Sequence, residues 1–154
     1  MLARIIFLLL MAATAGPQEA QSGVWMGTWR LNAAKSATAP DRYKRVITKI
    51  EPWEDGVRVE YDMVGVRGGV NHLEWTGKFD GKDYPVEGAD YIITNAYTVI
   101  DDHHYQIAVK VEGHLSANAR VEVSPDGKTL TTVTTERNGR GQTTSTTSVY
   151  ERIA

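Results

Sequence analysis

The sequence contains no cysteine among its 154 residues. Without thiols the chain cannot form disulfides, a cysteine-ligated zinc knuckle, a thiol nucleophile or the acylated cysteine of a lipoprotein. The formal net charge is only −2, and charges of one sign form no long runs, so the positive surface needed for non-specific nucleic-acid binding is missing. We therefore expect no nucleic-acid partner and a fold that depends on a packed core, which a chain of this length can bury.

Long hydrophobic runs are also missing, with one short exception at the amino terminus. There an apolar run follows Arg4 and ends at Ala13, which is too short for the roughly 20 residues that a bilayer span requires. The basic start, the apolar centre and the small residues at Ala13 and Ala15 are typical of a cleaved signal peptide. We expect residues 1–22 to be a signal peptide, cut after Ala15 or after Ser22, and the mature protein to be soluble, periplasmic or secreted, with no integral membrane segment.

Helical periodicity is hard to find after the signal peptide, whereas apolar and polar residues alternate in many short segments. In residues 57–63, four apolar side chains alternate with Arg58, Glu60 and Asp62, which places the two sets on opposite faces of a strand. Asp-Gly, Asn-Gly and Gly-Gly pairs separate such segments and are typical of hairpin turns. The sequence predicts ten strands, near residues 24–31, 43–51, 57–65, 70–79, 84–87, 91–100, 104–112, 118–124, 128–137 and 142–153.

Successive short strands joined by hairpins predict an antiparallel up-and-down meander. A meander of this length either leaves two edges open or closes on itself, and closure removes the unpaired edge groups that promote aggregation. We therefore expect an all-β protein, with one domain over residues 23–154 in which the meander closes into a barrel of about 8–10 strands. A long loop is expected at residues 32–41.

Gly27-Thr28-Trp29 begins the first expected strand, and Tyr150-Glu151-Arg152 ends the last one. These segments resemble the two ends of calycin barrels, the superfamily of lipocalins and fatty-acid-binding proteins. Together with the loop at 32–41 and the Asp-Gly-Lys turns at 80–82 and 126–128, they resemble more closely a group of small exported bacterial lipocalin-like proteins. That resemblance covers essentially the whole mature chain and brings no catalytic residue with it.

The resemblance implies a structural role for two residues: Trp29 plugs one end of the barrel, and Arg152 packs across its ring. It also draws attention to a missing cation. Fatty-acid-binding proteins hold the ligand carboxylate with an Arg-x-Tyr pair in the last strand, and the matching positions here are Ser148 and Tyr150. Because burying an unpaired carboxylate is costly, we expect neutral ligands to bind better than fatty-acid anions.

Several aromatic side chains fall on the more apolar faces of separate strands. Binding pockets are mostly apolar with a few polar groups, so we expect a non-enzymatic barrel that binds a small, mainly apolar molecule such as a lipid and uses no cofactor. The expected ligand contacts are Tyr61, Trp75, Tyr97, Tyr105 and Tyr150. In the alternative interpretation these side chains fill a dry core, and the protein is an envelope interaction protein with a filled barrel.

Catalytic and metal-binding patterns are sparse. No G-x-S-x-G nucleophile elbow occurs, so the enzyme alternative is a small isomerase, cyclase or hydrolase that uses His72 or His104 as a general base in the cavity. His72 with Glu74, and the cluster at residues 101–104, contain residue types that bind transition metals. Adjacent strand residues point to opposite faces, however, so His103 and His104 could bind one ion only in a distorted turn. For His72 and Glu74 the sequence identifies no further ligand. We predict an exposed polar face and a solvated turn at these positions, and no metal site.

Overall fold

The computed structural model describes residues 23–37 and 43–154. The expected signal peptide, residues 1–22, and part of the expected loop, residues 38–42, lie outside the described residues. Strands make up most of the rest, and the only helical element in the described ranges is a short 3-10 turn, η1. Within those same ranges, no helix has the length and apolar character needed to cross a membrane.

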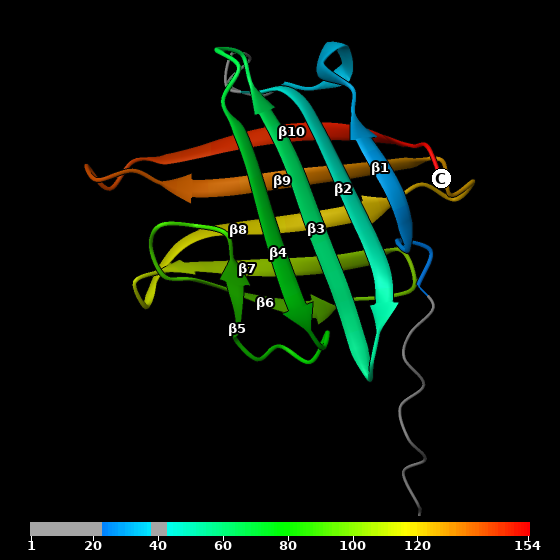
Figure 1. Cartoon of the computed structure of the whole chain (residues 1–154), viewed down its shortest axis with the longest axis horizontal. Coiled ribbons are helices and arrows are strands. Elements are labelled where there is room, and N and C mark those ends of the chain that lie inside the picture. Colours follow the sequence, from blue (N-terminus) through cyan, green and yellow to red (C-terminus); the bar gives the residue numbers. More distant parts are fainter. Residues whose placement is uncertain (1–22, 38–42) are drawn as a thin grey trace, which may run out of the picture.

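Ten strands follow one another as a meander, and the first pairs with the last. In chain order the elements are β1 (Gly27–Leu31), η1 (Ala33–Lys35), β2 (Tyr43–Trp53), β3 (Gly56–Gly65), β4 (Val70–Gly77), β5 (Tyr84–Glu87), β6 (Ile93–Val99), β7 (His104–Val111), β8 (His114–Val123), β9 (Thr129–Arg137) and β10 (Thr143–Arg152). All ladders are antiparallel, and the pairing of β1 with β10 closes the barrel. The prediction of an all-β, closed antiparallel barrel is confirmed. In Figure 1, β1 to β4 form a layer that runs across β6 to β10.

The strand boundaries differ from the sequence-based ones by more than two residues at two places, and by at most two residues elsewhere. Strand β1 begins at Gly27, because residues 23–26 form a turn instead of continuing the strand, and Gly27 itself has a φ of +134°. Strand β8 begins at His114, opposite Val111, and a register shift in its ladder with β7 follows immediately. At both places an irregular backbone interrupts the alternation on which the prediction depends.

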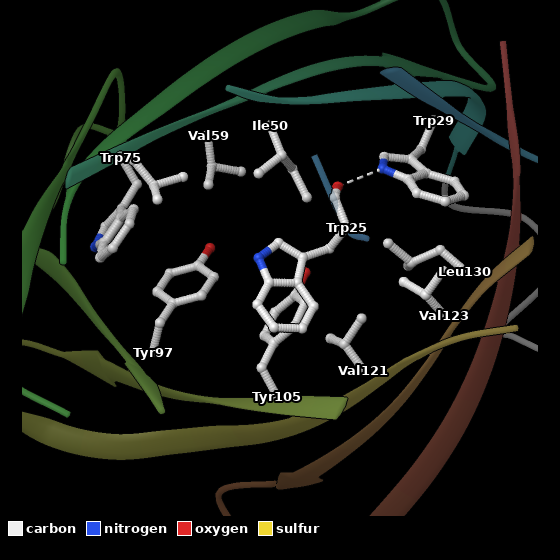
Figure 2. Packing of buried hydrophobic residues seen from close by; sticks show 11 residues of the cluster. Trp25, Trp29, Ile50, Val59, Trp75, Tyr97, Tyr105, Val121, Val123 and Leu130 are labelled. Atoms are coloured by element: carbon white, nitrogen blue, oxygen red, sulfur yellow. Dashed lines mark hydrogen bonds between the residues drawn. The ribbon is translucent and has the colours of Figure 1, made fainter. Parts of the chain in front are cut away.

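One end of the barrel is closed by the turn that precedes β1. Trp25 in this turn is 2 % exposed, and its carbonyl oxygen accepts a hydrogen bond from the Nε1 of the fully buried Trp29 at 2.9 Å (Figure 2). The guanidinium of Arg152 lies 4.2 Å from the centroid of the Trp29 ring. It also donates hydrogen bonds to the carbonyl oxygens of Val24 and Met26. Arg152 thus ties the last strand to both the first strand and the closing turn.

Aromatic rings fill one side of the barrel interior. Trp75 and Tyr97 are fully buried with ring centroids 4.1 Å apart, and Phe79 stacks on Tyr97 at 4.8 Å. Figure 2 shows Trp75 and Tyr97 on the side of the interior away from Trp29. This side of the barrel is therefore a packed aromatic core.

Candidate ligand-binding cavity

The side of the interior formed largely by β7 to β10 contains a cavity of about 280 Å³. This volume lies near the lower end of the range for small-molecule pockets. Glu136 lines the cavity and is also exposed at the surface. The cavity therefore reaches solvent at the end of the barrel where Glu136 lies, and we call this opening its mouth.

Small side chains on β8 create the space. Toward the closed end this strand presents Val121 to the interior, but the next inward positions are Ala119 and Ala117, both of which line the cavity. They stand opposite Thr134 and Glu136 of β9. Two alanines in a row on the inner face leave unfilled volume between β8 and the opposite wall.

The inner face of β9 becomes steadily more polar from the closed end to the open end. The cavity is lined in turn by Leu130, Thr132, Thr134 and Glu136. Leu130 is 5 % exposed and belongs to the core cluster that includes Trp29, whereas Glu136 is the penultimate residue of its strand. The cavity is therefore apolar at its closed end, hydroxyl-bearing in the middle and acidic at its mouth.

Three tyrosine side chains from other strands complete the wall: Tyr61, Tyr105 and Tyr150. Burial is the main cause that raises their pKa values, for Tyr150 to about 12. A phenol with a raised pKa keeps its proton at neutral pH and can donate a hydrogen bond. The hydroxyl of Tyr61 lies 2.5 Å from that of Tyr97. The wall thus offers neutral donors suited to a carbonyl or hydroxyl group.

The structure separates the expected ligand contacts into two groups. Tyr61, Tyr105 and Tyr150 line the cavity, whereas Trp75 and Tyr97 lie in the packed aromatic core. Trp29, which the resemblance assigns to the barrel end, also lines the closed end of the cavity.

The two histidines considered as general bases lie on the outer face of the barrel. His72 Nδ1 is 2.7 Å from Asp62 Oδ1, and this hydrogen bond is the main cause that raises the pKa of His72. His104 Nδ1 is 2.7 Å from Asp101 Oδ1. Neither side chain is among those that line the cavity, so the geometry places no histidine base inside it.

The structure adds one residue to the pair His72 and Glu74. Glu60 stands opposite Glu74 on β3, and the ligand atoms of the three residues lie within 4.8 Å of one another. Glu60 already has two cations nearby, with Lys49 Nζ at 3.9 Å and Arg58 Nε at 3.7 Å. The arrangement is an outward-facing, ion-paired polar surface.

A scan against protein-family models and a search of curated proteins both find no match for this chain.

Proposed function

We propose that this protein is an exported, lipocalin-like barrel that binds a small, mainly apolar molecule and performs no chemistry on it. The observation that carries the proposal is the cavity of about 280 Å³, which reaches the surface at Glu136. An apolar closed end and a hydroxyl-bearing wall suit a molecule with an apolar body and a few polar groups. Room for such a ligand is what distinguishes this barrel from a filled one.

The closed end supports the lipocalin-like part of the proposal. Arg152 lies across the ring of Trp29, as the calycin resemblance implies for these two residues. Their strands pair with each other, with Trp29 directly opposite Arg152. A plugged end keeps water from the cavity at that end, which helps a binding barrel to hold a ligand away from water.

The first test concerns the binding site itself. Thr134 and Thr135 are neighbours on β9, but Thr134 lines the cavity whereas Thr135 is exposed on the outer face. Thr134→Phe should fill part of the cavity and weaken the binding of 1-decanol at least about tenfold, equal to about 1.4 kcal/mol. Thr135→Phe should leave affinity unchanged. Isothermal titration calorimetry measures both.

Quenching of tryptophan fluorescence gives a second readout, because Trp29 lines the cavity. Equal affinities of the two variants for decanol would place its binding outside the cavity and contradict the proposal. A complete failure of the unmodified protein to bind would favour the interaction-protein hypothesis instead.

Export has a test of its own. When the full-length chain is expressed in a two-membrane bacterium, the periplasmic fraction should contain protein that begins at Gly16 or Gly23, as read by amino-terminal sequencing. Leu9→Asp, which places a charge in the apolar run, should prevent export and cleavage. Recovery of the unmodified protein from the cytoplasm with Met1 intact would contradict this part of the proposal.

A further inference from the structure

Glu136 is the one charged side chain among the described residues that line the cavity. Within the described part of the chain it also forms no ion pair. Some other acids of the barrel do have cationic partners: Glu51 is paired with Lys49 and Arg58, and Glu151 with Lys35. The carboxylate at the mouth of the cavity is therefore set apart from the other described glutamates by its position in the cavity lining.

The strands on either side of Glu136 leave its charge uncompensated. Its cross-strand neighbours are Ala117 on β8 and Thr144 on β10, and neither carries a charge. Arg137 follows on the same strand, but consecutive strand residues point to opposite faces. A cation brought by a bound molecule can thus meet this carboxylate without displacing a partner on the adjacent strands.

The groups around the carboxylate suit an ammonium head. A primary ammonium has three donors and no acceptor. The carboxylate of Glu136 can accept from one donor, and the hydroxyls of Thr134 and Ser116, which line the same cavity, can accept from the others. A bare metal ion would be coordinated less well, because a single carboxylate supplies too few of the oxygen ligands that hard cations require.

The apolar part of the cavity indicates what the rest of the ligand should be. Leu130 and Glu136 are six residues apart on one strand, which at about 3.3 Å per residue corresponds to roughly 20 Å. Trp29, Val121 and Leu130 form the wall at the far end. A linear alkyl chain whose head lies at Glu136 therefore extends toward these side chains.

We propose that the cavity selects amphiphilic amines, with the ammonium group paired to Glu136 at the mouth and the alkyl body inside the barrel. This inference rests on the proposed function, because it concerns the same cavity, and it names the class of ligand. The pair forms where water has access, so its contribution is that of a partly screened ion pair. We expect an amine to bind about fivefold to tenfold more tightly than the alcohol of the same length.

The experiment compares three probes that differ only in the head group: decylamine, 1-decanol and decanoate. Affinities are measured by calorimetry on the mature protein at pH 7.5, each below its aggregation concentration. The expected order is amine, then alcohol, then acid. In Glu136→Gln the affinity for the amine should fall to that for the alcohol, while the affinity for the alcohol stays the same.

Glu122→Gln is the matched control, because it removes the same charge from an exposed residue on the outer face of β8. This variant should keep the full preference for the amine. The inference is overturned, while the proposed function stands, if decanol binds but decylamine binds no more tightly, or if the two Gln variants behave alike. If none of the three probes binds, the proposed function itself fails, and the inference fails with it.

Discussion

Trp29→Ala should lower the free energy of unfolding by about 3–5 kcal/mol, the usual cost of removing a buried tryptophan from a core. Trp29 is fully buried, and its indole Nε1 donates to the carbonyl oxygen of Trp25. The cation of Arg152 over its ring adds an interaction on the order of 1–2 kcal/mol. The substitution removes all of these contributions at the point where β1 meets β10.

Urea unfolding followed by circular dichroism measures this change. Trp53→Ala is the control, because Trp53 also has an arginine over its ring, with Arg58 at 3.9 Å, but is 39 % exposed. Its loss should cost much less than the loss of Trp29. An unchanged urea midpoint in Trp29→Ala would remove the main support for a plugged barrel end.

Trp75→Ala should be destabilising to a similar extent, by about 3–5 kcal/mol, for a different reason. Trp75 packs edge-on against Tyr84 and close to Tyr97, and its Nε1 donates to the carbonyl oxygen of Asn95 at 3.1 Å. Its removal leaves a cavity in the aromatic core.

Trp75→Phe separates packing from hydrogen bonding at this position. It retains an aromatic ring but leaves the buried carbonyl oxygen of Asn95 without its indole donor, so it should cost about 1–3 kcal/mol. Denaturant midpoints for the two variants give the comparison. A Trp75→Ala variant no less stable than Trp75→Phe would show that ring packing contributes little here.

Most of the barrel could be predicted from the sequence, because regular alternation identifies strands and Gly-containing pairs identify hairpins. Strand β3 is the clearest example, since Val57, Val59 and Tyr61 alternate with charged residues and stand on the inner face. The role of Trp25 could not be predicted in this way. Alternation extends the first strand back over it, whereas the structure places it in a turn that folds into the barrel end. Turn residues carry no periodic signal of their packing.

The cavity was harder to predict from the sequence than the strands were. Alternation indicates which face of a strand is apolar, but empty volume depends on which side chains meet across the barrel. The alanines Ala117 and Ala119 make that volume. Glu136 was not predicted to line the cavity, because the part of β9 that precedes it has threonine on both faces. The pattern in residues 129–135 therefore does not indicate which face is inside. Trp75 and Tyr97 lie on inner faces, as alternation predicts, but they do not line the cavity. The rings of Phe79 and Trp25 pack on that side of the interior and fill it.

The seam between β1 and β10 also determines when the barrel can form. Every other ladder joins consecutive strands, whereas the hydrogen bond from Arg152 to Met26 spans 126 residues. As the chain emerges during synthesis, β2 to β9 can pair one after another, but β1 keeps an unpaired edge, which is a route to aggregation. Closure thus depends on contacts between residues more than 100 positions apart in the sequence, and such contacts form slowly. Because Tyr150 on β10 lines the cavity and Arg152 completes the seam, the chain can hold a ligand only after its synthesis has reached Arg152.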